Sequence, residues 1–371
     1  MSRALWTYNF GSKTSLLILL TVVLVKSVLI PESLVQPTTQ KTAFAGPDRN
    51  FPTGVNFSVI NSYESIVGWL LSLPNEFPFV RLHHIGMTVE HRDLIVVEID
   101  STDDGFAVTG IKPTIFVDAG IHAREQLTVS IALNAIHKIC CMIRDGKVAS
   151  STKVKWFIIP LVNPDGYEYA STDSGVGWRK NRSPANNSDC VGVALNRNWD
   201  YKWKGSGSST SPCSDIYAGV RPFSESETFA LSQFILELKN NSAVNLQAYL
   251  SLHSIHGYLG QAIIFPYGYT TERSPDYDVL SAVAKRMSDA MYAATSRTYR
   301  YGSIANEMYP VNGDQGDWLY FVAKIKQNYA VELRDYYGKD SAVLVSDGFK
   351  DIWAALTVLA QDTLARNYLA M

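Results

Sequence analysis

Side chains that bind metals and anions follow directly after an apolar run in the first third of the chain. The run KPTIFV is typical of a buried strand. The segment DAGIHAREQ at residues 118–126 then places His122 and Glu125 three residues apart, with Arg124 between them. A turn after a strand requires none of these side chains. A metal site beside an anionic substrate would use all three, whereas an exposed pair on a first helical turn is the structural alternative.

A second histidine occupies a comparable position. His253 lies in LSLHS, at the end of another apolar run. Functional groups of α/β sheets gather at the carboxyl ends of strands, so His253 could meet His122 and Glu125 there. Two histidines and one carboxylate leave the fourth position of tetrahedral Zn²⁺ open, as catalytic zinc requires. Zinc lowers the pKa of a bound water to about 7, which would supply a nucleophile at neutral pH.

A carboxylate interrupts an apolar strand near the C-terminus. Glu332 lies in QNYAVELRD, between Val331 and Leu333. An unpaired buried carboxylate is costly, and the structural alternative is a buried ion pair with Arg334. Adjacent strand residues point to opposite faces, which weakens that alternative. The pattern favours a general base that lines a cavity.

Two further segments carry arginines that would suit an anionic substrate. GWRKNRS contains Arg179, and ALNRNWD contains Asn196 and Arg197. A solvated basic loop is the ordinary explanation for either segment. The planar guanidinium of Arg197, with Asn196 beside it, would bind a carboxylate through two parallel hydrogen bonds. Arg179 would suit a developing oxyanion.

Composition and charge are those of an ordinary globular protein. The chain has 371 residues, of which 46% are hydrophobic and 18% charged, and its formal net charge is −2. That balance predicts neither a nucleic-acid partner nor an anionic membrane surface. We therefore expect no nucleic-acid partner, no stable membrane association and a monomer.

The N-terminus has the pattern of a secretory signal. Basic residues precede an apolar stretch from Leu16 to Val25, which is too short to span a bilayer comfortably. A retained signal anchor is the alternative. We expect a secreted protein with a signal peptide at 1–30, a linker or pro-segment remnant at 31–55, and one catalytic domain at 56–371.

Helical and strand patterns alternate along that domain. Apolar residues recur at helical spacing at 63–73, 124–143, 226–239, 281–296 and 348–370. Short apolar runs predict strands at 93–99, 113–120, 153–162, 244–254 and 327–335. Continuous apolar strands that alternate with helices predict an α/β fold, a mainly parallel or mixed sheet covered on both faces.

Taken in order, the motifs of this domain resemble those of the zinc metallocarboxypeptidases of the carboxypeptidase A/B family, peptidase family M14. The resemblance rests on HAREQ, NPDGY, WRKNRS, NRNWD, YAGVRPFSESET, LHS, FPYGY, MYPVNGDQGDW and VELRD. It runs from about residue 56 to the C-terminus with the family's order and comparable spacing. It implies a twisted, mixed, eight-stranded sheet with helices on both sides, and hydrolysis of the C-terminal peptide bond of peptides and proteins.

The resemblance also implies a role for each candidate residue. The positions that match the ligands of one zinc ion per chain are His122, Glu125 and His253. Glu332 matches the catalytic glutamate, and Arg179 matches the arginine that polarises the scissile carbonyl. The positions that match substrate-binding groups are Arg124, Asn196, Arg197 and Tyr309, of which the last three hold the terminal carboxylate. Cys190 and Cys213 match the family disulfide.

Two departures from the family concern the metal. Many relatives carry an aspartate two residues before the Asn-Arg pair, where it orients a zinc-binding histidine, but Ala194 occupies that position here. Losing such a partner typically costs about 10- to 100-fold in metal affinity or activity, so we expect weakened zinc binding. The segment after His253 is longer than in typical relatives, which makes His256 an alternative ligand. It would face the other way on a strand, which favours His253.

A third departure concerns side-chain preference. Gly316 occupies the position that is aliphatic in relatives preferring apolar C-termini and aspartate in relatives preferring Lys or Arg. Other pocket-matching positions are apolar and favour hydrophobic side chains: Ile304, Met308, Val311 and Ala330. Asp314 lies two residues before Gly316 and could instead reach a basic side chain.

Two other classes of function compete with a carboxypeptidase. A peptide-binding pseudoenzyme would keep the cleft without turnover, and Ala194 is its only support. A zinc amidase or deacylase on the same scaffold would not need the cluster of Asn196, Arg197 and Tyr309. That cluster therefore argues for a substrate with a free carboxylate.

Overall fold

The structure is a computed structural model that describes residues 54–101, 111–185, 188–255, 260–334 and 341–370. The signal peptide expected at 1–30, nearly all of the segment 31–55 and the alternative ligand His256 lie outside these residues.

One mixed sheet of eight strands organises the part of the chain that the structure describes. The strand order is β1-β2-β4-β3-β5-β8-β6-β7. The pairs β4/β3, β3/β5, β5/β8 and β6/β7 are parallel, and the pairs β1/β2, β2/β4 and β6/β8 are antiparallel. In chain order the strands are Val80–Met87, Asp93–Ile99, Pro113–Ala119, Lys155–Ile159, Asn245–Ile255, Ala262–Phe265, Arg300–Ser303 and Gln327–Arg334. The predicted α/β fold with a mixed eight-stranded sheet is confirmed.

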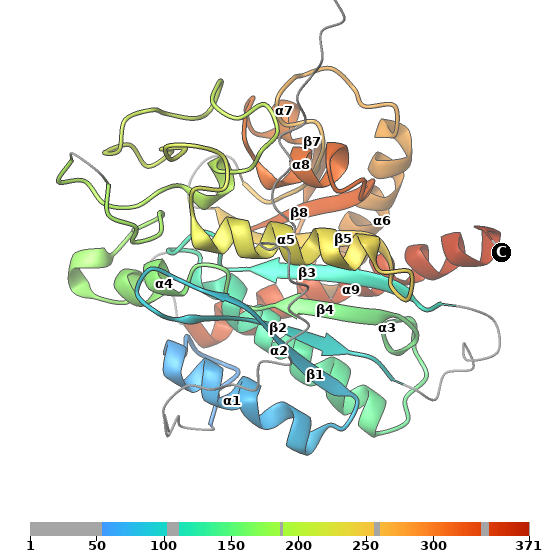
Figure 1. Cartoon of the computed structure of the whole chain (residues 1–371). Helices are drawn as coiled ribbons and strands as arrows, with labels where there is room; N and C mark the ends of the chain where they lie inside the picture. Colours follow the sequence, from blue (N-terminus) through green and yellow to red (C-terminus); the bar gives the residue numbers. More distant parts are fainter. Residues whose placement is uncertain (1–53, 102–110, 186–187, 256–259, 335–340, 371) are drawn as a thin grey trace, which may run out of the picture. The chain divides into compact units, whose positions relative to one another are not determined.

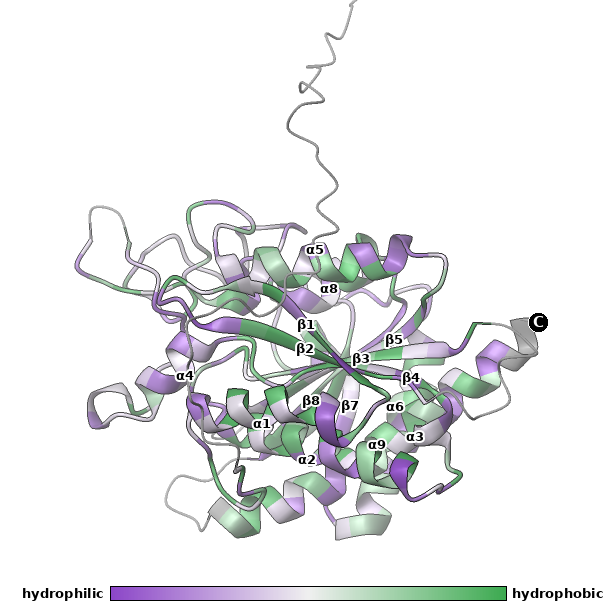
Figure 2. Cartoon of the chain, turned by 60° about the horizontal axis from the view of Figure 1, so that its bottom comes forward, coloured by the Kyte–Doolittle hydropathy of each residue, from purple (hydrophilic) through white to green (hydrophobic). Residues whose placement is uncertain are grey.

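Helices cover both faces of this sheet. Figure 2 shows α5 and α8 on one side and α1, α2, α6 and α9 on the other, and α5 lies across the front of the sheet in Figure 1. The long helices are α1 Tyr63–Glu76, α2 Gln126–Arg144, α5 Ser226–Asn240, α6 Tyr277–Thr295 and α9 Ser341–Ala370. Shorter ones are α3 Ser150–Lys153, α4 Pro164–Ala170, α7 Ile304–Glu307 and α8 Gln315–Phe321, with 3₁₀ turns η3 Asp173–Gly175 and η4 Leu195–Arg197.

The apolar residues of the central strands divide between two cores. In β3, Ile115 and Val117 pack into the core beneath α2 and α9, whereas Phe116 packs into the core beneath α5. Successive side chains of a strand point to opposite faces, so both sides of a central strand must be apolar when both are covered. Because both faces of β3 are buried, its sequence is a nearly continuous apolar run.

The central parallel strands carry the candidate site. β3, β5 and β8 are neighbours, so their carboxyl ends lie at one edge of the sheet. His253 of β5 is paired in register with Glu332 of β8. The segment after β3 that carries His122 and Glu125 begins at the same edge.

Among the residues that the structure describes, the α2 helix is long and apolar enough to span a membrane. Most of it is buried, and residues such as Val129, Ile131 and Ile136 belong to the core beneath the sheet. Core helices of globular proteins pass the same composition test, so α2 is explained by its burial here.

Candidate metal centre and substrate pocket

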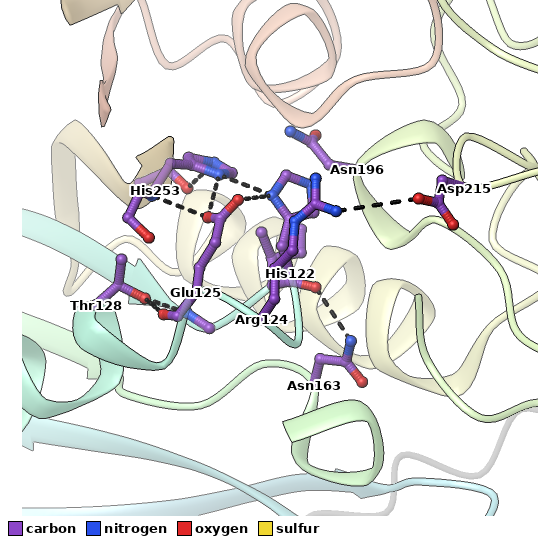
Figure 3. A network of polar contacts seen from close by, with 12 residues as sticks. His122, Arg124, Glu125, Thr128, Asn163, Asn196, Asp215 and His253 are labelled. Atoms are coloured by element: carbon purple, nitrogen blue, oxygen red, sulfur yellow. Dashed lines mark hydrogen bonds and ion pairs between the residues drawn. The ribbon is translucent and has the colours of Figure 1, made fainter. Parts of the chain in front are cut away.

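Two histidines and one glutamate converge at the carboxyl ends of β3 and β5. Nδ1 of His122 lies 2.7 Å from Oε1 of Glu125, and Nδ1 of His253 lies 3.2 Å from Oε2 of the same carboxylate. The two Nδ1 atoms are 3.3 Å apart. Figure 3 shows the three side chains pointing toward one another. All three are buried, so the sequence prediction that they meet is supported by their geometry.

This arrangement fits a zinc ion. Ligand atoms that lie about 2.05 Å from a tetrahedral zinc ion are about 3.3 Å from one another. Nδ1 of His253 lies at a similar distance from Nδ1 of His122 and from Oε2 of Glu125. Burial lowers the pKa of His122 well below its usual value, and so does the nearby charge of Arg179. The neutral imidazole that results is the form that binds a metal. A single carboxylate facing two buried imidazoles is a donor set that zinc takes in catalytic sites.

The backbone after β3 is shaped to bring these ligands together. Gly120 has φ +68°, and a Cβ there would lie 2.7 Å from Cγ2 of Val129, so a larger residue would be strained and crowded. The backbone N–H of Gly120 donates to Oγ1 of Thr128, which itself donates to the carbonyl of Glu125. These bonds close the turn just before α2 begins.

The two histidines differ in the hydrogen bonding of Nε2, the ring nitrogen that faces away from the candidate metal position. Nε2 of His253 lies 3.1 Å from the hydroxyl of Ser251. Nε2 of His122 is buried and has no hydrogen-bond partner among the described residues. Ala194, the position that the family resemblance matches to an aspartate of many relatives, is fully buried directly before η4 and offers no side-chain acceptor.

Glu332 lies on the wall of the pocket that holds these ligands. Its neighbours Val331 and Leu333 face the opposite side of the sheet and join the core there, as the alternating pattern predicted. Desolvation raises the pKa of Glu332 to about 7, and the charge of Glu125 acts in the same direction. A carboxyl group with a pKa near neutrality can both accept and return a proton, which suits a general base.

Arg179 faces the same pocket from the loop that follows η3. Desolvation and the neighbouring Arg197 lower the pKa of Arg179 to about 10, so its guanidinium stays protonated at neutral pH. Its Nε is buried without a hydrogen-bond partner among the described residues. A buried cation with a free donor is suited to stabilise negative charge that develops on a substrate oxygen.

Arg197 is a buried cation held in one orientation. Its Nε donates to the carbonyl of Gly207 at 2.6 Å, and one terminal nitrogen donates to the carbonyl of Asn196 at 2.6 Å. The other terminal nitrogen donates to the hydroxyl of Tyr309 at 3.0 Å. The side-chain oxygen of Asn196 accepts the N–H of Gln315, which leaves the amide nitrogen of Asn196 as a donor for a ligand.

Arg124 lies at the rim of the site. Its guanidinium donates to the carbonyl of Gly177 at 3.4 Å and lies 4.0 Å from the carboxylate of Asp215, which is largely exposed. Figure 3 shows this pair beside His122. Sequence reasoning singled out Arg124 and did not find Asp215.

One pocket joins all of these groups. Its cavity volume is about 260 Å³. Every predicted metal, catalytic and substrate-binding residue lines it: His122, Arg124, Glu125, Arg179, Asn196, Arg197, His253, Tyr309, Gly316 and Glu332. The predicted specificity positions line it too: Ile304, Met308, Val311, Asp314 and Ala330.

Sequence reasoning missed the polar residues that support the pocket from beneath, namely Asp118, Tyr249, Ser251 and Gln315. The one available signal was the acid Asp118 at the end of an apolar run. The predicted disulfide between Cys190 and Cys213 forms and closes the loop that carries Arg197. Cys140 is a buried free thiol, whereas the free thiol of Cys141 is half-buried.

The sequence is similar to a family of known proteins over most of its length. The model of the family described as zinc carboxypeptidase matches residues 66–349. Carboxypeptidase A2 of Mus musculus is 36% identical over 77% of this chain and 66% of its own length. Carboxypeptidase B of Astacus astacus is 34% identical over 76% of this chain and 88% of its own length. The chain thus spans just under two thirds of the mouse and rat carboxypeptidase A2 sequences that it matches.

Solved structures share the fold. Bovine thrombin-activatable fibrinolysis inhibitor, in complex with a tick carboxypeptidase inhibitor, is 29% identical with a TM-score of 0.74, covering 84% of this chain and 99% of that one. The carboxypeptidase A of Helicoverpa armigera is 28% identical with a TM-score of 0.73, covering 86% of this chain and 77% of that one.

Proposed function

The chain belongs to the zinc carboxypeptidase family, and from this membership we propose that it is a zinc-dependent exopeptidase that hydrolyses the C-terminal peptide bond of peptides and proteins. The observation that carries the proposal is the environment of Arg197. This buried cation is fixed by three hydrogen bonds and lines the same pocket as the three candidate metal ligands. A fixed positive charge beside the reacting groups selects a chain that ends in a free carboxylate.

The pocket divides the chemistry among its residues. Arg197, Asn196 and Tyr309 bind the terminal carboxylate and place the last peptide bond near His122, Glu125 and His253, which would hold one zinc ion. When bound there, zinc acidifies a water and polarises the scissile carbonyl. Glu332 accepts a proton from the attacking water and delivers it to the leaving amine, and Arg179 donates to the carbonyl oxygen as charge develops on it.

The walls of the pocket favour an apolar C-terminal side chain. Ile304, Met308, Val311 and Ala330 all line it. Transfer of an aliphatic or aromatic side chain to such a surface is favourable in proportion to the apolar area buried. Aliphatic and aromatic C-terminal residues are therefore the first candidates for the preferred substrate.

One observation favours basic C-terminal residues as a second candidate. Oδ1 of Asp314 is buried without a hydrogen-bond partner among the described residues. Asp314 and Asn328 line the pocket beside Gly316, and a Cβ at 316 would lie 3.3 Å from Oδ2 of Asp314 and 3.6 Å from Oδ1 of Asn328. A Lys or Arg side chain could bind there, and Asp314→Asn should then selectively slow release of basic residues.

Secretion is also part of the proposal. The disulfide between Cys190 and Cys213 supports it, because disulfides persist in oxidising compartments outside the cytosol. The apolar stretch from Leu16 to Val25 is the expected signal. Secretion can be tested by expressing the full chain in cells. We expect the protein in the culture medium, without its N-terminal segment.

The test of the activity compares two peptides that differ only in a free or an amidated C-terminus. We expect hydrolysis of the free acid alone. Arg197→Lys removes the planar fork, and loss of a charge-assisted hydrogen bond of about 1.5–3 kcal/mol should lower kcat/KM about 10- to 100-fold. Arg221→Lys changes an exposed arginine and is the matched control. Equal hydrolysis of both peptides by the parent protein would overturn the proposal.

A further inference from the structure

A fully buried carboxylate lies beneath the metal site and takes no part in the chemistry described above. Asp118 is the penultimate residue of β3, has no exposed surface and accepts three hydrogen bonds. The donors are the hydroxyl of Tyr249, the hydroxyl of Ser251 at 2.6 Å and the side-chain amide of Gln315 at 2.8 Å. Burying such a group without function is costly, even when it is paired.

The hydroxyl of Ser251 links this carboxylate to a metal ligand. Ser251 is paired in register with Asp118 and lies two residues before His253 on the same face of β5. Its Oγ is 2.6 Å from Oδ1 of Asp118 and 3.1 Å from Nε2 of His253. The three groups therefore form one continuous chain of hydrogen bonds that ends at the metal site.

The direction of each bond follows from the role of His253. Its Nδ1 faces Glu125 and His122, so Nδ1 must carry no proton when a metal binds there. The proton of the neutral ring is then on Nε2 and is donated to Oγ of Ser251. Ser251 uses its own proton to donate to Asp118, which accepts. Only one tautomer and one ring orientation of His253 satisfy the whole chain.

We propose that Asp118, acting through Ser251, is a positioning residue that holds His253 in the tautomer and orientation required for metal binding. Gln315 extends the same support to the substrate side, because its side chain donates to Asp118 and its backbone N–H donates to Asn196. Nε2 of His122 has no partner among the described residues, so among these residues His253 is the candidate ligand whose second ring nitrogen is hydrogen-bonded. The inference rests on the proposed function in one respect, that a metal binds at His122, Glu125 and His253.

The test measures zinc dissociation constants by competition with a chromogenic chelator, so the measurement does not depend on catalysis. Ser251→Ala should weaken zinc binding about 10- to 100-fold, the usual effect of removing a partner of a ligating histidine. Asp118→Asn should weaken it similarly. Ser251→Thr keeps the hydroxyl and should bind zinc more tightly than Ser251→Ala, close to the affinity of the parent protein.

Tyr249→Phe is the matched control. It removes one hydrogen bond to Asp118 and leaves the chain from Asp118 through Ser251 to His253 intact. If the carboxylate serves only the stability of the fold, Tyr249→Phe and Ser251→Ala will lower the melting temperature alike and leave the zinc affinity unchanged. Zinc binding by Ser251→Ala within twofold of the parent overturns the proposal, even if Asp118→Asn fails to fold. Absence of zinc binding by the parent protein overturns both this inference and the proposed function, whereas zinc binding without peptide hydrolysis overturns the proposed function alone.

Discussion

Replacing Ala194 by aspartate should tighten zinc binding, because it offers a partner to a histidine nitrogen that has none within the described part of the chain. Nε2 of His122 is buried without a hydrogen-bond partner among the described residues, and its Nδ1 faces the carboxylate of Glu125. When Nδ1 binds a metal, the ring proton is on Nε2, where none of the described residues accepts it. The resemblance to the carboxypeptidase A/B family implies such a partner, because many relatives carry an aspartate at the position of Ala194 that orients a zinc-binding histidine.

The size of the effect follows from the cost of the unpaired group. A buried donor without a partner costs about 1–3 kcal/mol, and each 1.4 kcal/mol corresponds to a factor of about ten. Supplying a carboxylate acceptor to His122 should therefore lower the zinc dissociation constant about 10- to 100-fold, the range seen for such partners. A charged acceptor gains more than a neutral one, so Ala194→Asn should have a smaller effect than Ala194→Asp.

The assay is chelator competition at neutral pH on the parent protein, Ala194→Asp and Ala194→Asn, with melting temperatures measured without metal to show that each variant folds. We expect the order of affinity Asp, then Asn, then Ala at position 194. A folded Ala194→Asp protein with the zinc dissociation constant of the parent would contradict this prediction, since Nε2 of His122 would then gain nothing from a carboxylate.

Three further predictions concern catalysis and stability. Glu332→Gln should lower kcat/KM about 10²- to 10⁴-fold. Because the pKa of Glu332 is raised to about 7, kcat/KM of the parent should fall as the pH drops below about 7, and a parent profile that stays flat there would contradict the role. Burial raises the pKa of Glu227 to about 8, so the folded state favours the protonated carboxyl. The resulting contribution to the unfolding free energy is complete below the unfolded pKa near 4.5 and is lost as the pH rises through 8. Glu227→Gln should remove this pH dependence, up to roughly 5 kcal/mol of the unfolding free energy measured in urea. The same pH dependence in the variant and the parent would contradict the role of Glu227. Removing the disulfide with Cys190→Ser and Cys213→Ser should cost about 3 kcal/mol of unfolding free energy, whereas no loss would show that the loop is held by other contacts.

The reacting groups could be predicted from sequence because each one breaks a local pattern. His122 and Glu125 follow a buried strand, and Glu332 interrupts an apolar one, so chemistry explains residues that packing does not. The long helices and central strands were predicted because their apolar periodicity is strong. α2 and β8 lie within a few residues of the expected ranges.

The edge of the sheet and the support beneath the site could not be predicted in the same way. β1 is half-buried along most of its length, and β6 and β7 have only four residues each, too few for a period to show. The contact of Gln315 with Asp118 joins residues that are 197 positions apart. Such a contact depends on the order of strands in the sheet, which local periodicity does not contain.

The most direct test of carboxypeptidase activity is mass spectrometry of a mixed pool of free-acid and amidated peptides, incubated with the purified zinc-loaded protein with and without a zinc chelator. We expect stepwise loss of single C-terminal residues from the free acids only, abolished by the chelator. The residues released will distinguish apolar from basic preference. Internal cleavage, hydrolysis of the amidated peptides, or no hydrolysis by a folded and zinc-loaded protein would contradict this expectation.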